Sequence, residues 1–274
     1  MRVPFVKMEG AGNDYVFVDA IRDAFPFERA PEFARAWSDR RFGIGSDGLI
    51  ALRRGARAAV AMSMWNADGS EGAMCGNGLR CLAALAREHG HVAVDAFVVE
   101  TKAGDRSVEI RRDRDGALRD VVADMGRVVV DTEPTIVTCA GHSLRVFRGD
   151  VGNPHAVCFV DGDLDSFPVE AIGAELQQHA AFPGGVNVEF VRVEPDGSLR
   201  QRTYERGSGE TLACGTGATA AAVCAMQRGL VSGDEVLVRL RGGELRVARR
   251  GSSLVLAGPA RTVFTGFVDV HPRA

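Results

Sequence analysis

The sequence predicts a sheet-rich α+β fold in which two related halves follow one another along the chain. Short runs of alternating or β-branched residues recur throughout and are separated by Gly, Asp and Pro. The pattern E-x-x-x-C-G-x-G occurs twice, beginning at Glu71 and at Glu210, and its cysteines are 139 positions apart (214 minus 75). A small-residue run typical of a helix follows each copy. The repeat therefore predicts one helix in each half, with Cys75 or Cys214 at its N-terminus.

The remaining elements follow from the same patterns. Strands are expected at 3–8, 15–19, 60–65, 97–100, 107–112, 144–147, 156–161, 186–193, 235–240, 244–248, 253–258 and 261–270. Two further helices are expected at 30–40 and 168–180, at equivalent positions in the two halves. The charged stretch at 111–120 interrupts the apolar pattern and predicts domains at 1–118 and 119–260. Residues 261–274 follow the second repeat, so we expect them to return to the first domain's sheet.

Composition narrows the classes of function. The chain has 274 residues, 46% of them hydrophobic, which suffices for two domains with buried cores. A net charge of -3 without a basic stripe argues against nucleic acid, and no polybasic cluster or apolar span suggests a membrane. No signal peptide is recognisable, and six cysteines in a chain of this size are expected to remain thiols in a reducing cytoplasm. We expect a cytoplasmic protein whose partners are small molecules.

The duplicated cysteines suggest a specific chemistry. The positive end of a helix dipole and its free N–H groups favour thiolate over thiol. Two cysteine thiols that flank one substrate carbon suit racemisation or epimerisation. In these reactions a base removes a proton from one face of the carbon, and an acid delivers another proton to the opposite face. No pyridoxal-binding feature is recognisable, so we expect no cofactor. The backbone N–H groups of Gly76, Asn77, Gly215 and Thr216 could stabilise the developing charge on a carboxylate.

Six strings along the chain resemble the diaminopimelate epimerase family: MEGAGNDYVFVD, GIGSDGL, NADGSEGAMCGNGLRC, VGNPHAV, FPGGVNVEF and YERGSGETLACGTGA. The resemblance covers essentially the whole chain. It implies two homologous domains, each a curled, mostly antiparallel and barrel-like β-sheet around a central helix, with the active site in the interdomain cleft. It also implies cofactor-independent interconversion of LL- and meso-diaminopimelate, for lysine and peptidoglycan precursor synthesis, by a homodimer.

The resemblance assigns roles by matching motif. Cys75 and Cys214 would be the acid/base thiols, and His155 and Glu205 would adjust thiol protonation. The substrate-binding residues would be Asn13, Asn66, Gly76, Asn77, Asn153, Asn187, Glu205, Arg206, Gly215 and Thr216. A carboxylate beside a guanidinium suits the substrate's distal ammonium and carboxylate. Among the departures from the family pattern, Glu189 stands where glycine is common, and Phe264 replaces a tyrosine that some members use at a homodimer interface.

Other interpretations remain open at this point. Cys81, Cys139, Cys158 and Cys224 are expected to be buried small hydrophobic residues. The cysteines lack the short spacings of a zinc site, so we expect no metal. Neither Gly-rich turn has the Gly-Lys-Ser/Thr ending of a nucleotide loop. One alternative function is a related racemase of another amino acid, such as histidine or a proline derivative. Another is a thiol redox or binding protein in which Cys75 and Cys214 form a reversible disulfide.

Overall fold

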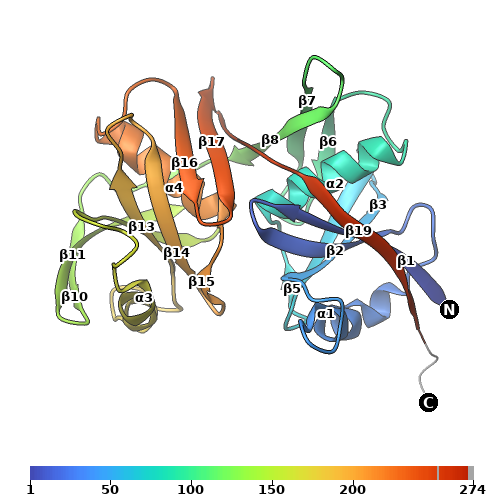
Figure 1. Cartoon of the computed structure of the whole chain (residues 1–274), viewed down its shortest axis with the longest axis horizontal. Coiled ribbons are helices and arrows are strands. Elements are labelled where there is room, and N and C mark those ends of the chain that lie inside the picture. Colours follow the sequence, from blue (N-terminus) through green and yellow to red (C-terminus); the bar gives the residue numbers. More distant parts are fainter. Residues whose placement is uncertain (252, 271–274) are drawn as a thin grey trace. The chain divides into compact units, whose positions relative to one another are not determined.

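The chain forms two compact units, Met1–Ala123 with Gly258–Ala274 and Asp124–Ala257 (Figure 1). This computed structural model describes residues 1–251 and 253–270. The division after residue 123 falls inside strand β8 (Leu118–Gly126), which begins where the sequence placed the domain boundary. The final four positions of the expected segment 261–274 lie outside the described residues.

The first unit is a mixed sheet in the order β19-β1-β2-β3-β4-β6-β7-β8. Two neighbouring pairs are parallel, β2 with β3 and β4 with β6, and the others are antiparallel. The short β5 pairs with β4. The strands are β1 (Arg2–Gly10), β2 (Asn13–Asp19), β3 (Gly48–Arg54), β4 (Val60–Asn66), β5 (Glu71–Gly72), β6 (Ala96–Glu100), β7 (Arg106–Arg112) and β19 (Arg261–Asp269). Strand β19, which follows the second repeat, pairs with β1.

The second unit repeats this topology as β10-β11-β12-β13-β14-β16-β17-β18. Its parallel pairs, β12 with β13 and β14 with β16, are the counterparts of those in the first unit. The strands are β9 (Val129–Val130), β10 (Thr135–Cys139), β11 (His142–Asp150), β12 (Pro154–Phe159), β13 (Asn187–Val193), β14 (Leu199–Glu205), β15 (Gly209–Thr211), β16 (Glu235–Leu240), β17 (Gly243–Arg250) and β18 (Ser253–Gly258). The expected α+β fold with two pseudo-symmetric domains is therefore confirmed.

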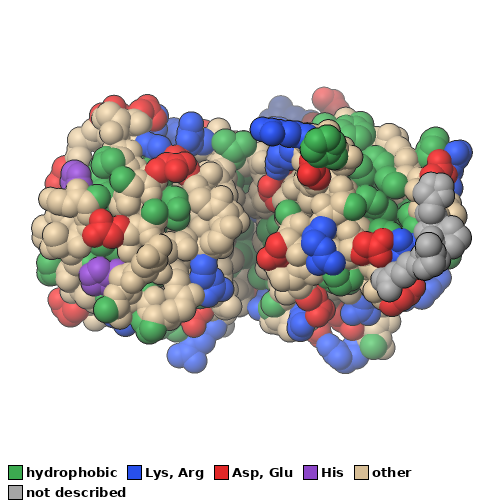
Figure 2. Space-filling model, turned by 90° about the horizontal axis from the view of Figure 1, so that it is seen from below, with side chains coloured by type: hydrophobic (Ala, Val, Ile, Leu, Met, Phe, Trp, Pro, Cys, Tyr) green, Lys and Arg blue, Asp and Glu red, His purple; other side chains and the backbone are tan. Residues whose placement is uncertain are grey.

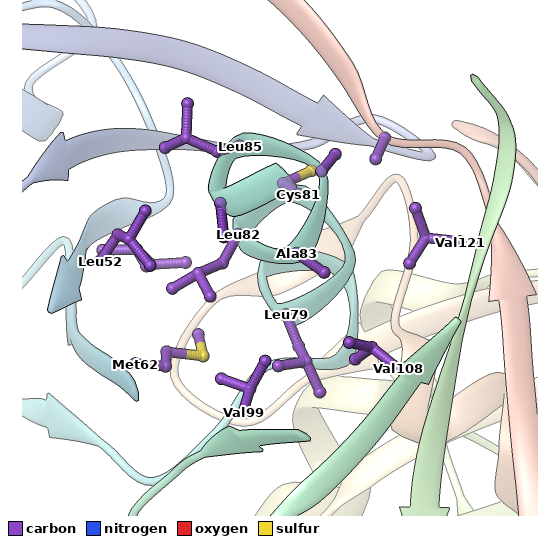
Figure 3. Packing of buried hydrophobic residues seen from close by; sticks show 14 of the residues in the cluster. Leu52, Met62, Leu79, Cys81, Leu82, Ala83, Leu85, Val99, Val108 and Val121 are labelled. Atoms are coloured by element: carbon purple, nitrogen blue, oxygen red, sulfur yellow. The ribbon is translucent and has the colours of Figure 1, made fainter. Parts of the chain in front are cut away.

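One helix fills the hollow of each curled sheet: α2 (Gly76–Glu88) in the first unit and α4 (Gly215–Gln227) in the second. In Figure 3, Leu79 of α2 points toward Val99 and Val108, and Leu82 points toward Leu52 and Met62 of the surrounding strands. The small residues of α4 allow equally close packing, and Ala220, Ala221, Ala222 and Ala225 are fully buried. Central helices of this kind are buried on nearly every face, and residues 76–86 of α2 and 217–225 of α4 are buried.

A second helix covers the outer face of each sheet, α1 (Ala30–Ser38) and α3 (Val169–Gln177). Phe33 and Trp37 of α1 stack with ring centroids 4.8 Å apart and pack in a cluster with Leu49 and Ala51 of β3. Ile50 of the same strand belongs instead to the cluster around α2. Strand β3 is thus buried on both faces, which explains its unbroken apolar run.

Among the described residues, the longest helices lack the length and apolarity needed to cross a lipid bilayer. On the face seen in Figure 2, acidic and basic side chains are interspersed over both units.

Candidate active site

Cys75 and Cys214 are the N-cap residues of α2 and α4, as the repeated motif predicted. Both have extended backbones, with φ of -128° and -121°. Each cap carbonyl accepts the first helical hydrogen bond, Cys75 from the N–H of Leu79 and Cys214 from that of Ala218. The glycine three positions after each cysteine leaves room for a neighbouring side chain beneath the first turn, Ile50 at Gly78 and Glu189 at Gly217.

In the first unit, the thiol belongs to a chain of oriented amides. Cys75 donates to Asn13 Oδ1 at 3.3 Å, and Asn77 Nδ2 donates to the same oxygen at 3.3 Å. Asn13 Nδ2 donates to Asp47 Oδ2 at 2.6 Å, and Arg80 Nη2 donates to Asn77 Oδ1 at 2.9 Å. Because a guanidinium only donates and a carboxylate only accepts, the two ends fix both amide orientations. Asn13 therefore presents its oxygen to Cys75.

The two ends of this chain, Asp47 and Arg80, were not singled out by the sequence. Arg80 is fully buried, and its other acceptors are the carbonyl oxygens of Gly76 and Pro259. Burial lowers the pKa of its guanidinium. Burial, with the charge of Asp14 as the next cause, raises the pKa of Asp47. Arg80 could have been identified from the sequence, because it is a cation among the small and apolar residues that follow Cys75.

The predicted ligand Asn66 lies at the end of β4, where it is exposed and its amide donates to Ser70 Oγ at 3.0 Å. Its substrate role stays a prediction.

In the second unit, Cys214 is buried and has two polar neighbours. The N–H of Gly217 donates to its sulfur at 3.4 Å, and Thr216 Oγ1 lies 3.4 Å from it. Burial, followed by the charges of Glu205 and Glu189, raises the pKa of this thiol well above its usual value. The N–H of Gly217 lowers this pKa, as expected of a helix N-terminus, but desolvation and the two carboxylates outweigh it.

Asn153 and His155 connect Cys214 to a carboxylate beneath it. Asn153 Nδ2 donates to Thr216 Oγ1 at 3.4 Å, and Asn153 Oδ1 lies 2.9 Å from His155 Nε2. His155 Nδ1 is 2.8 Å from Glu189 Oε1, and both of these side chains have no exposed area. In the sequence, Glu189 was recognisable only as a departure from the family pattern. Its place behind His155 comes from the parallel pairing of β12 with β13.

Three further predicted residues lie in the second unit around β13 and β14. Asn187 accepts the N–H of Arg206 at 3.0 Å, which fixes the start of the turn after β14. Glu205 accepts the hydroxyl of Thr211 at 2.6 Å. A cavity of about 420 Å³ is lined by Asn153, His155 and Arg206, together with Arg148. Two guanidinium groups against the one carboxylate of Asp150 favour an anionic ligand at this cavity.

Away from the N-terminus of α2, Asp19, His89 and His91 have ligand atoms within 4.8 Å of one another. Asp19 Oδ2 lies 2.7 Å from His89 Nδ1 and 2.7 Å from His91 Nε2, while backbone N–H groups of Ile21 and Arg22 donate to its other oxygen. Hydrogen bonds account for this cluster, which joins the end of β2 to the C-terminus of α2. The expectation that the protein uses no metal stays a prediction.

All six cysteines are free, and Cys81, Cys139, Cys158 and Cys224 are buried as expected. Burial raises the pKa of Cys81 and of Cys224 to about 12. These thiols are inert in comparison with a half-buried cysteine such as Cys75.

Comparison with known proteins defines first a class and then a family. The fold resembles a crystal structure of a Bacillus anthracis phenazine biosynthesis protein of the PhzF family, with a TM-score of 0.78, 16% identity and coverage of 98% of this chain and 100% of that chain. The chain is therefore a member of this class of two-domain, pseudo-symmetric α+β proteins.

Sequence comparison is more specific. The family model for diaminopimelate epimerase matches residues 5–130 and 147–263. Diaminopimelate epimerase of Leptospira biflexa is 39% identical over 98% of this chain and 100% of its own length, and that of Geobacillus kaustophilus is 42% identical over 96% and 95%. The chain belongs to the diaminopimelate epimerase family, and it is an isomerase.

Proposed function

We propose that the protein epimerises LL-diaminopimelate to meso-diaminopimelate without a cofactor, with Cys75 and Cys214 as the two acid/base groups. The observation that carries the proposal is the occurrence of a cysteine N-cap at the same position of both repeats. One thiol removes the α-proton as a thiolate, and the other delivers a proton to the opposite face. The raised pKa of resting Cys214 favours its thiol, the form that can deliver a proton.

The other predicted residues would hold the substrate during this exchange. The helix N-termini at Gly76-Asn77 and Gly215-Thr216 offer N–H groups to the α-carboxylate, whose charge grows in the carbanionic transition state. Asn13, Asn66, Asn153 and Asn187 would contact its polar groups. Glu205 and Arg206 would bind the distal ammonium and carboxylate, and the second cation Arg148 at the same cavity supports an anionic distal end. The reaction would serve lysine and peptidoglycan precursor synthesis.

The test is incubation of the reduced protein with LL-diaminopimelate in heavy water, followed by analysis of α-deuterium and of the meso isomer. Both should appear, and both should disappear in Cys75→Ala and in Cys214→Ala. Turnover that survives either substitution would eliminate the two-thiol mechanism. If neither product forms, histidine and proline derivatives become the next substrates to test, and a protein without any proton exchange would fit the redox alternative.

We also propose a cytoplasmic homodimer. Strand β19 exposes Val263, Phe264 and Phe267, with exposed fractions of 55%, 45% and 56%. Exposed apolar side chains on an outer strand favour a protein contact, and a second copy of the chain is the partner implied by the family. Phe264→Glu should convert a dimer to a monomer in sedimentation experiments, and a wild-type protein that sediments as a monomer would contradict this part.

A further inference from the structure

Glu189 is an ionisable residue at a position where packing alone needs an apolar one. Strands β3 and β13 are equivalent, and Ile50 occupies the position corresponding to Glu189 at the repeat offset of 139 (189 minus 50). A Cβ atom built on Gly78 would lie 2.4 Å from Ile50 Cδ1, and one built on Gly217 would lie 2.4 Å from Glu189 Oε1. The same space beneath the first helical turn therefore holds a methyl group in one repeat and a carboxylate in the other.

The environment of this carboxylate is costly without a compensating role. Glu189 has no exposed area, and among the described residues its Oε2 atom has no hydrogen-bond partner. Burial raises the pKa of its carboxyl group, against the opposing effect of His155. A buried charge needs a close partner or a proton, and an isoleucine would need neither.

The contacts of His155 determine how many protons the pair holds. Asn153 Oδ1 can only accept, so the facing Nε2 atom of His155 carries a hydrogen. Nδ1 and Glu189 Oε1 are 2.8 Å apart, a distance that requires one proton between a nitrogen lone pair and a carboxylate oxygen. That proton belongs to Nδ1 in an imidazolium–carboxylate pair or to Oε1 in a neutral pair. In both cases the net charge of the pair is zero.

We propose that Glu189 is a positioning residue of the predicted reaction, which shares one proton with His155 and thereby supports the ionisation of Cys214 through Asn153 and Thr216. When Cys214 releases its proton, the shared proton moves from Glu189 Oε1 to His155 Nδ1. A positive charge then lies on the imidazole, nearer the new thiolate. The proton returns to Oε1 when Cys214 is protonated again, and none is exchanged with solvent. This role rests on the proposed function of Cys214.

The titratable groups of this network lie on three neighbouring strands. His155 lies on β12, Glu189 on β13 and Glu205 on β14, and both carboxylates oppose formation of the thiolate. Arg148 and Arg206 line the cavity that His155 also reaches, and Cys158 is the other thiol affected by the charge of Glu189. A bare Glu189 carboxylate would therefore hinder Cys214 ionisation, whereas a proton-sharing pair assists it.

The substitution Glu189→Gln distinguishes a bare carboxylate from a proton-sharing pair. Loss of a bare carboxylate would lower the pKa of Cys214, whereas loss of the proton-sharing pair would raise it. Glutamine keeps the shape of the side chain and can donate to His155 Nδ1, but it has no proton to transfer. In a Cys75→Ala background, the rate of iodoacetamide alkylation at Cys214, located by mass spectrometry, would be followed against pH. The proposal expects the midpoint to rise by about one pH unit, a tenfold loss of thiolate at a given pH. A midpoint that falls or stays unchanged would overturn it.

Two controls keep the result interpretable. Glu235→Gln removes a charge from an exposed carboxylate at the start of β16 in the same unit and should leave the midpoint unchanged. If Glu189→Gln does not fold, nitrogen-15 NMR of histidine-labelled wild-type protein provides the answer. If His155 and Glu189 share a proton, Nε2 of His155 is protonated and the chemical shift of Nδ1 lies between the values of a free and a protonated nitrogen. An Nε2 atom without a hydrogen would refute the proposal.

Turnover then connects the pair to the proposed function. With LL-diaminopimelate, Glu189→Gln should reduce kcat about tenfold while KM stays within about twofold, because ionisation rather than binding is impaired. The titration and the NMR experiment need no substrate. A positive titration without epimerase activity would thus contradict only the substrate assignment, whereas activity with an unshifted titration would contradict only the role of Glu189.

Discussion

The internal repeat offers a matched pair of substitutions, Gly78→Ala in α2 and Gly217→Ala in α4. Each new methyl group would lie 2.4 Å from a side-chain atom, Cδ1 of Ile50 or Oε1 of Glu189, and that atom must move by about 1 Å to reach ordinary contact at 3.4 Å. The isoleucine methyl can rotate away. The carboxylate oxygen is held by His155 at 2.8 Å and has little room to move without breaking that hydrogen bond.

The expected losses of stability for Gly78→Ala and Gly217→Ala differ by the hydrogen bond between Glu189 and His155. Replacing a helical glycine by alanine gains about 1 kcal/mol, and overpacking costs about 1–3 kcal/mol, which leaves about 0–2 kcal/mol for Gly78→Ala. Gly217→Ala additionally weakens a buried hydrogen bond between ionisable groups, worth about 1.5–3 kcal/mol. Urea unfolding, followed through backbone amide NMR signals of the unit that carries each substitution, measures both free energies. Equal costs within about 0.5 kcal/mol would refute the argument, given the usual size of that bond.

Three further predictions concern the first unit. Asp14→Asn leaves the ammonium of Lys7, whose side chain is 7% exposed, without its carboxylate and should cost about 3–5 kcal/mol of stability in thermal unfolding. Arg2→Gln, at an ion pair whose side chains are 61% and 57% exposed, should cost about 0–1 kcal/mol. Similar values for both would contradict the burial argument. Backbone N–H groups of residues 56–58 lower the pKa of Glu100 from 4.5 to about 2. Its contribution to stability is therefore complete above pH 4.5 and lost as pH falls toward 2, and Glu100→Gln should flatten unfolding curves in that window; an unchanged acid dependence would count against it. Iodoacetamide should modify Cys75 well before the buried thiols of Cys81, Cys139, Cys158 and Cys224, and mass spectrometry showing comparable rates would disprove the assigned burial.

Much of the fold could be predicted because the sequence repeats its local signals. The glycine-flanked cysteines predicted both helix N-caps, and the small-residue runs predicted both central helices. Strand β3 was missed because Leu49, Ile50 and Ala51 are consecutive and all buried, so the strand lacks alternation. Strand β8 was missed because it begins inside the charged stretch that suggested a boundary, and β10 because its run is short.

The polar partners of the candidate site were less accessible to sequence reasoning. Asp47 follows a loop and reaches Asn13 only through the pairing of β2 with β3, and Glu189 reaches His155 through that of β12 with β13. Both contacts are set by strand register, which local patterns do not specify. The protonation state of Cys214 depends on burial and on two carboxylates from other strands, so the helix-dipole argument could not determine it.

The pairing of β1 with β19 has a consequence for how the chain is made. The first unit takes its strands from both sides of the second unit, and Met1 and Val270 exchange backbone hydrogen bonds. During synthesis, β1 is an unpaired sheet edge until residues 261–269 have left the ribosome, while residues 124–257 already hold a complete sheet. The first unit, whose synthesis begins first, thus completes its sheet last. An incomplete chain would expose the unpaired edge of β1, which could pair with strands of other chains and promote aggregation.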